Sequence, residues 1–162
     1  MTERRLRRLI LGLTLVGILV AGYLSYVHFA GIKPLCVPGG GCEKVQESRW
    51  AWVNGHKNGF LPVAYLGLAG YFGILGSLFV RGENGRFLTA ALALPGWAFS
   101  AYLTYNELVN VKAICWWCMG SFTLITLIAI LSTWRLLRGE EIAEVQSAST
   151  ELEDSEIGGG PQ

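Results

Sequence analysis

Charge is scarce in this chain. Only 15% of its 162 residues are charged, with 13 Lys and Arg against 12 Asp and Glu, so the formal net charge is +1. A soluble domain needs more polar surface than this composition provides. A balance so close to neutral gives no indication of nucleic-acid binding. The two histidines, His28 and His56, have no second histidine or carboxylate at ligand spacing, which argues against a metal site built on them.

Long apolar stretches fill most of the chain instead. Hydrophobic residues make up 52% of the sequence, and the mean hydropathy is +0.41. A helix needs roughly 20 residues to cross the hydrocarbon core of a bilayer. We therefore predict an all-α membrane protein with a bundle of four transmembrane helices over residues 9–30, 60–80, 87–105 and 114–137. Pro95 and Gly96 interrupt the third stretch. A soluble helical bundle is the alternative, but it would have almost no polar surface.

Small residues recur every four positions on the first two of these stretches. They are Gly17, Ala21 and Ser25 on the first, and Ala69, Gly73 and Ser77 on the second. Small side chains at this spacing let helix backbones approach closely in lipid. We therefore expect the two helices to pack tightly.

Most arginines fall on one side of this four-helix arrangement. They are Arg4, Arg5, Arg7, Arg8, Arg81, Arg86, Arg135 and Arg138. The positive-inside rule makes that side cytoplasmic. We therefore expect both termini in the cytoplasm and the loop over residues 31–59 on the extracytoplasmic side. Glu107 and Lys112 could steer a partner or influence Cys115, but we expect them to be solvated residues of the second outward loop.

The chain divides into two parts. Residues 1–138 form the predicted membrane domain. Residues 139–162 are acidic, poor in large apolar side chains and end in three glycines before Pro161 and Gln162. This composition is typical of disorder, so we expect a disordered acidic tail in the cytoplasm.

The four cysteines form two pairs, and both pairs map to the outward side, where thiols are oxidised. Cys115 and Cys118 form a C-x-x-C at the outer end of the fourth helix, one turn apart, where the helix dipole favours a thiolate. Cys36 and Cys42 enclose a glycine-rich segment that can bend until the two sulfurs bond. A mobile pair beside a fixed pair is the arrangement expected of a thiol–disulfide relay.

Other interpretations of the cysteines stay open at this point. The pairs could be purely structural disulfides, which is the strongest alternative. Four thiolates could hold zinc, although five residues separate Cys36 from Cys42, more than in a usual zinc knuckle. The C-x-x-C could also be an incidental pair of buried thiols.

Several motifs, in this order, resemble the vitamin K epoxide reductase family, and its bacterial members in particular. They are Cys36 and Cys42, then Ser48-Arg49-Trp50, then Leu61-Pro62-Val63-Ala64 before Leu66-Gly67, and finally Cys115-Trp116-Trp117-Cys118. The resemblance implies a four-helix membrane bundle around a quinone site, capped by the extracytoplasmic loop, in the bacterial cytoplasmic (inner) membrane. It extends from the first predicted helix to the fourth.

The resemblance also implies roles for the cysteines. Cys115 and Cys118 would be the redox pair at the quinone, with Cys118 nearest the ring. Cys36 and Cys42 would be the shuttle pair. In that assignment Cys42 meets the partner protein and Cys36 hands electrons to Cys115.

Three further residues are implied to bind the quinone. Ser48 matches a serine that supports the quinone site, although a hydroxyl that caps a short helix is the alternative. Trp50 matches an aromatic residue of the cap. Phe122 stands where vertebrate members place a tyrosine that contacts the substrate carbonyl, so a hydrogen bond from that position is not available in this chain.

The implied function is that of a membrane thiol oxidoreductase that supports disulfide formation in secreted proteins. Some bacterial relatives carry a fused thioredoxin-like domain, and we expect none in this chain, so the partner would be a separate extracytoplasmic thioredoxin-fold (DsbA-like) protein. The electron acceptor would be ubiquinone or menaquinone. Two alternatives remain: a vitamin K quinone or epoxide reductase, and a membrane scaffold stapled by disulfides that is not an enzyme.

Overall fold

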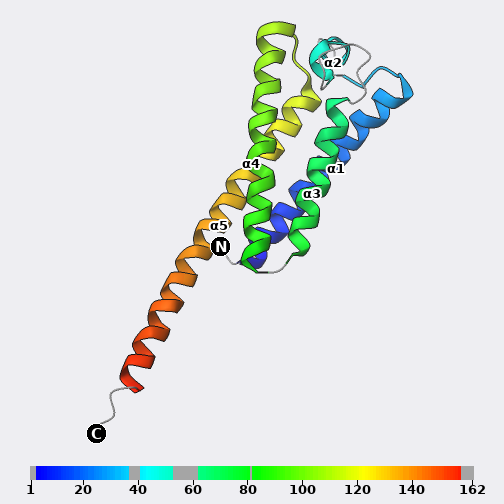
Figure 1. Cartoon of the computed structure of the whole chain (residues 1–162). Coiled ribbons are helices and arrows are strands. Elements are labelled where there is room, and N and C mark those ends of the chain that lie inside the picture. The colour runs from blue at the N-terminus through cyan, green and yellow to red at the C-terminus, as the bar shows by residue number, and fades with distance from the viewer. Residues whose placement is uncertain (1–2, 37–40, 53–61, 81, 158–162) are drawn as a thin grey trace.

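The computed structural model describes residues 3–36, 41–52, 62–80 and 82–157, and only the backbone of residues 3, 49 and 140–157. Almost all of these residues are helical (Figure 1). The long helices are α1 (Glu3–Ala30), α3 (Val63–Phe79), α4 (Glu83–Asn106) and α5 (Trp116–Ile157). The short ones are α2 (Cys42–Gln46), the 3-10 helix η1 (Arg49–Ala51) and the π-helix η2 (Glu107–Val111). The described part contains no strand, only an isolated bridge between Trp52 and Pro62.

The four long helices form one bundle. α1 packs against α3 and α5, and α4 packs against α3 and α5. Their shared core consists of side chains with almost no exposed surface: Ile10, Ala21, Tyr71, Ile74, Leu78, Ala93, Ile125, Ile128 and Ala129.

The buried hydroxyl groups between α3 and α4 all form hydrogen bonds. Ser77 and Thr89 bond each other at 2.8 Å, and Thr89 also donates to the carbonyl of Gly85. Neither of these two buried hydroxyls is therefore left without a hydrogen-bond partner.

The outside of the bundle is apolar. Leu19, Phe29, Phe79 and Ile130 are between 58% and 83% exposed, and many other large apolar side chains join them. Water would not tolerate such a surface, but hydrocarbon does. Segments Arg4–Ala30, Glu83–Val111 and Trp116–Gly139 are long and apolar enough to span a bilayer. With 17 residues, α3 lies at the short end of that range. The predicted all-α membrane bundle is confirmed.

Two local features differ from a uniform helical bundle. α4 continues without a break through Pro95, where the sequence showed an interruption. Neighbouring helices allow such a proline inside a membrane helix. Gly31 follows the end of α1 with a φ of 63°, a left-handed conformation that ends helices and that glycine adopts most easily.

The expected close packing of α1 and α3 has a specific basis at Gly17. A Cβ atom on Gly17 would collide with the ring of Tyr71. Tyr71 crosses the bundle at this point, and its hydroxyl bonds the backbone carbonyl and the hydroxyl of Ser121 in α5. Glycine at position 17 therefore lets one buried tyrosine join three helices.

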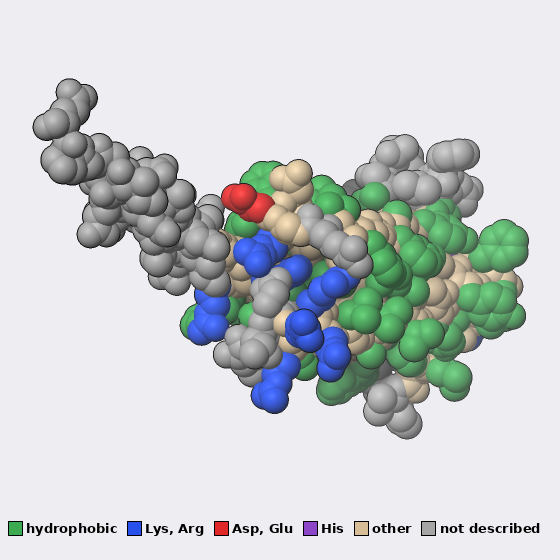
Figure 2. Space-filling view, turned by 90° about the horizontal axis from the view of Figure 1, so that it is seen from below, with side chains coloured by type: hydrophobic (Ala, Val, Ile, Leu, Met, Phe, Trp, Pro, Cys, Tyr) green, Lys and Arg blue, Asp and Glu red, His purple; other side chains and the backbone are tan. Residues whose placement is uncertain are grey.

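The two ends of the bundle differ in chemistry. We call one the arginine end: it contains the start of α1, the connection from α3 to α4, and Arg135 and Arg138 of α5. Figure 2 shows the Lys and Arg side chains gathered there. At the opposite end, which we call the cysteine end, α2 lies near the upper part of α4 and contacts η2 (Figure 1). Arg81 lies outside the described residues.

The carboxyl-terminal part differs from the expected disordered tail. The backbone of α5 stays helical as far as Ile157. Between Glu140 and Ile157 the sequence contains no glycine or proline, and it includes several glutamates, alanines and other helix formers. Local helix propensity accounts for this extension. The last described residue of the helix is Ile157, and three glycines follow it in the sequence.

Candidate functional site

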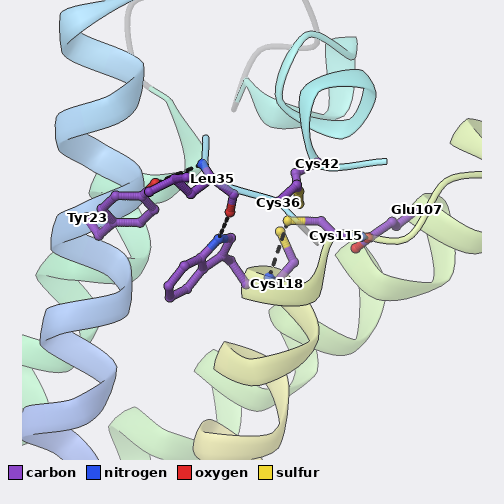
Figure 3. The surroundings of a disulfide bond; sticks show 8 residues. Tyr23, Leu35, Cys36, Cys42, Glu107, Cys115 and Cys118 are labelled. Carbon is purple, nitrogen blue, oxygen red and sulfur yellow. Dashed lines mark hydrogen bonds between the residues drawn. A yellow bond between two sulfur atoms is a disulfide. The ribbon is translucent and has the colours of Figure 1, made fainter. Parts of the chain in front are cut away.

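All four cysteines lie together at the cysteine end. Cys36 and Cys42 form a disulfide, with their Cα atoms 6.2 Å apart, whereas Cys115 and Cys118 are free thiols. Figure 3 shows the sulfurs of the free pair turned toward this disulfide. Within the described ranges, no group of three or more His, Cys, Asp or Glu residues is arranged to hold a metal ion. The predicted mobile pair and fixed pair are thus adjacent in space.

A backbone hydrogen bond sets the position of the loop pair against the helix pair. The N–H of Gly41 donates to the carbonyl of Ile114 at 3.0 Å. Gly41 precedes Cys42, and Ile114 precedes Cys115. A Cβ atom on Gly41 would collide with the side chain of Ala113, so only glycine permits this approach. The result is that Cys42 and Cys115 are neighbours, both with 0% exposure.

A second contact holds the chain just before Cys36. The backbone N–H of Leu35 donates to the hydroxyl of Tyr23 at 2.9 Å. The indole N–H of Trp117 donates to the carbonyl of Leu35 at 2.7 Å. The Tyr23 and Trp117 rings also contact each other, with centroids 4.8 Å apart. One side chain from α1 and one from the C-x-x-C segment therefore clamp the residue beside Cys36.

Cys115 occupies the cap of α5. Its carbonyl accepts the first helical hydrogen bond, from Met119, and its sulfur accepts the N–H of Cys118 at 3.4 Å. The side chain of Cys118 also donates to this sulfur, and that bond is the largest cause that lowers the pKa of the Cys115 thiol. Burial and the nearby charge of Glu107 act in the opposite direction. The net lowering agrees with the thiolate character that the sequence predicted for the first cysteine of the motif.

Glu107 is a member of the site, although the sequence favoured a solvated loop residue over an influence on Cys115. It is only 5% exposed, and its carboxylate accepts the backbone N–H of Cys115. The π-helix η2 and the left-handed Lys112, with a φ of 50°, reverse the chain between the two residues. The expectation of a solvated loop residue is therefore wrong for Glu107, although Lys112 is exposed. A carboxylate at the end of an apolar stretch, eight positions before the C-x-x-C, was the available signal.

A cavity of about 150 Å³ opens beside Cys118, between the helices and the segment around α2. Its lining is mostly apolar and includes Cys118, Ser48, Trp50, Phe122, His28 and Glu107. A dry cavity of this volume has room for a six-membered aromatic ring. The three residues that the resemblance assigned to quinone binding therefore share one cavity with a free thiol.

The side chains that line this cavity differ in whether they can donate a hydrogen bond to a ligand. The hydroxyl of Ser48 donates to the carbonyl of Val45 at 2.7 Å, near the end of α2, which is not the cap in which a hydroxyl accepts a backbone N–H. Its hydrogen is therefore already engaged. Phe122 has no polar atom to offer. His28, which sequence reasoning left without a role, borders the cavity and packs edge to face on Trp52 at 4.8 Å.

Comparison with known proteins gives one family. Residues 8–133 match the family model described as "Vitamin K epoxide reductase family". The matched span includes most of the chain, all four cysteines and every residue that lines the cavity. No curated protein matches the chain.

Proposed function

The chain belongs to the vitamin K epoxide reductase family, and from that premise we propose that it oxidises a thioredoxin-fold protein and passes the electrons to a membrane quinone. Membership makes it a membrane oxidoreductase that works through cysteine thiols. The identities of the partner and the acceptor belong to the proposal. One observation carries it: a disulfide is held against a free thiol pair at the mouth of an apolar cavity.

In the first step, a thiolate of the reduced partner attacks the Cys36–Cys42 disulfide. The partner ends with a disulfide, and Cys36 and Cys42 become thiols, so two electrons and two protons enter this chain. The resemblance assigned the attacked sulfur to Cys42. Because Cys42 is fully buried and Cys36 is half-buried, the geometry supports Cys36 as the attacked residue and Cys42 as the residue that faces Cys115.

In the second step, the loop thiols reduce a Cys115–Cys118 disulfide. A Cys42 thiolate attacks Cys115, a mixed disulfide forms, and Cys36 then resolves it, which releases Cys115 and Cys118 as thiols. The loop disulfide closes again. The bonding pattern in this structure, with a closed loop pair and an open helix pair, corresponds to the end of this step.

In the third step, the thiols of Cys115 and Cys118 give up two electrons and two protons and close to a disulfide. A quinone supplies the oxidising power when bound, since it takes up those electrons and protons as it becomes a quinol. The lining residues fit such a group: Trp50 and Phe122 offer aromatic surface, and Cys118 offers the sulfur. The predicted Cys118 contact with the ring is part of this proposal.

We also propose an orientation. The arginine end lies in the cytoplasm and the cysteine end faces outward, in a bacterial cytoplasmic membrane. Single cysteines introduced into a cysteine-free variant test this. A membrane-impermeant maleimide added to intact cells should label Leu35→Cys and not Arg138→Cys. Labelling of Arg138→Cys alone would reverse the orientation.

The reaction is tested with purified protein, a reduced thioredoxin-fold protein and a soluble quinone analogue. We expect quinone consumption that is lost in each of the Cys36→Ser, Cys42→Ser, Cys115→Ser and Cys118→Ser variants. Full activity in all four variants would overturn the relay and support a stapled scaffold. If the protein instead reduces vitamin K epoxide and transfers no disulfide, that result would support the alternative of a vitamin K quinone or epoxide reductase.

A further inference from the structure

We propose that Glu107 takes the proton that the Cys115 thiol gives up and holds it beside the quinone cavity. This inference rests on the proposed function and goes beyond it, because it assigns a proton-holding residue at the boundary between the thiol pair and the cavity. The one carboxylate does two things: it positions the cap of α5 through a backbone bond, and it exchanges a proton with the thiol at that cap.

The first support is the place of the carboxylate. Glu107 accepts the backbone N–H of Cys115, the residue whose sulfur caps the same helix. Figure 3 shows Glu107 reaching Cys115 from the side opposite Cys118. It also borders the cavity that contains Cys118. A proton on this carboxylate is therefore adjacent to both the thiol pair and the space where a quinone ring would lie.

The second support is electrostatic. Glu107 and Cys115 are buried, with exposures of 5% and 0%, and both lie at the start of α5. Two negative charges so close together in an apolar site repel each other strongly, whereas one is stabilised by the helix N-terminus. The pair therefore favours a single shared negative charge. When Cys115 is a thiolate, Glu107 is protonated. When Cys115 is a thiol, Glu107 is a carboxylate.

The third support is the lack of another acid at this place. Among the described residues that line the cavity, Glu107 has the only carboxylate, and His28 and Cys118 are the other groups that can titrate. His28 belongs to α1 and packs on Trp52. On η2 and the turn that follows it, Lys112 is exposed. The proton from Cys115 thus has one nearby carboxylate to accept it.

Atoms and electrons balance in this step. Cys115 and Cys118 lose two electrons and two protons as the S–S bond forms. The proton of Cys115 passes through Glu107, and the proton of Cys118 leaves from its own sulfur at the cavity. Both protons and both electrons end on the quinone, which is the oxidant that the proposed function names. Glu107 returns to a carboxylate and is ready for the next turnover.

The decisive variant is Glu107→Gln. Its amide oxygen can still accept the Cys115 N–H, so the cap of α5 is kept, but it cannot hold the proton. Glu107→Asp keeps an acid on a shorter side chain and serves as the conservative rescue. Glu43→Gln is the matched control, since Glu43 lies on the exterior and forms an exposed ion pair with Lys33.

Two readouts are measured. The first needs no quinone: in a Cys36→Ala, Cys42→Ala, Cys118→Ala background, Cys115 is the only thiol, and its ionisation is followed by thiolate absorbance against pH. Loss of the Glu107 charge should move that titration to lower pH. The second is the rate of quinone analogue reduction with dithiothreitol as the electron donor. This rate should fall by about 100-fold in Glu107→Gln, as when a proton-transfer group is removed.

The two expected changes run in opposite directions: the thiol ionises more readily, yet the quinone is reduced more slowly. Glu107→Asp should recover part of the rate, and Glu43→Gln should match the parent in both readouts. An unmoved titration, or a Glu107→Gln rate equal to or above that of the parent, would overturn the proposal. Absence of quinone reduction in the parent would instead reject the proposed function, while the titration would still test the pairing of Glu107 with Cys115.

Discussion

Trp117 donates its indole N–H to the carbonyl of Leu35 at 2.7 Å, and so connects two segments that are 82 positions apart. Trp117 lies between the cysteines of the C-x-x-C, and Leu35 lies directly before Cys36. The same side chain therefore belongs to the fixed thiol pair and holds the loop that carries the mobile pair. This contact gives the middle of the motif a specific task, which is to keep the two pairs within reach of each other.

Trp117→Phe should slow electron transfer from the loop pair to the helix pair. The phenylalanine ring keeps contact with Tyr23 but loses the bond to Leu35. A hydrogen bond of this kind contributes about 1 kcal/mol, so we expect about a fivefold lower rate of exchange. Stopped-flow thiol exchange measures it. Trp116→Phe is the control, because Trp116 is 59% exposed, and an equal loss there would contradict the assignment.

Gly41→Ala should separate the two pairs for a steric reason. The added methyl group would collide with Ala113 and break the approach that the Gly41 to Ile114 bond fixes. We expect slow exchange between Cys42 and Cys115 while the bundle remains folded. The double variant Gly41→Ala, Ala113→Gly removes the colliding methyl group and should restore much of the rate. Gly12→Ala, which meets no neighbouring atom, should have no effect.

The fold could be predicted largely from the sequence, because length and apolar composition alone decide which segments become membrane helices. The same four predicted helices also place most of the arginines at one end of the bundle. Features that depend on local helix propensity were harder to predict. Composition predicted disorder beyond Gly139, whereas the lack of glycine and proline between 140 and 157 allows α5 to continue. Pro95 suggested a break that packing against α3 and α5 makes unnecessary.

The site was predictable where a motif marks it and not where only geometry does. The cysteine pairs are visible as spacings, and the resemblance led to Ser48, Trp50 and Phe122, which share the cavity. An influence of Glu107 on Cys115 was ranked below loop solvation, because the burial of Glu107 depends on a π-helical turn and a left-handed lysine that fold it back onto Cys115. A carboxylate at the end of an apolar stretch marks Glu107 as a candidate, but its spacing alone does not predict that the chain returns to Cys115.

Burial predicts which loop cysteine faces the helix pair. In a Cys36→Ser, Cys118→Ser variant, only Cys42 and Cys115 remain, and a mild oxidant should join them rapidly. The Cys42→Ser, Cys118→Ser variant leaves Cys36 and Cys115, and their cross-link should form more slowly, because Cys42 is the cysteine beside Gly41 and its bond to Ile114. Mass spectrometry of the digested protein measures both rates. A faster Cys36–Cys115 cross-link would restore the assignment that the family resemblance implied.

The pH dependence of Cys115 reactivity follows from its local bonds. The hydrogen bond from the Cys118 side chain lowers the pKa of Cys115 below its ordinary value of 9.0, so the thiolate is populated at lower pH than in an ordinary thiol. Alkylation of Cys115 in the folded protein should rise with pH and reach half of its maximum below 9.0. In the unfolded chain the midpoint should return toward the ordinary value. Cys118→Ala should raise the midpoint of the folded protein, and an unchanged midpoint would contradict the role of the Cys118 hydrogen bond.

His28 should contribute to quinone affinity, because its ring borders the cavity while the hydrogen of Ser48 is engaged with Val45. A ring N–H can donate to a quinone carbonyl, which Phe122 cannot do. His28→Phe keeps the aromatic packing on Trp52 and removes the donor, so we expect the Kd of a quinone analogue to rise by about fivefold, as for one lost hydrogen bond. Equilibrium binding to the purified protein measures it. Ser48→Ala should raise this Kd less than His28→Phe, since the Ser48 hydroxyl already donates to the carbonyl of Val45. A larger rise in Ser48→Ala than in His28→Phe would assign the donor role to Ser48.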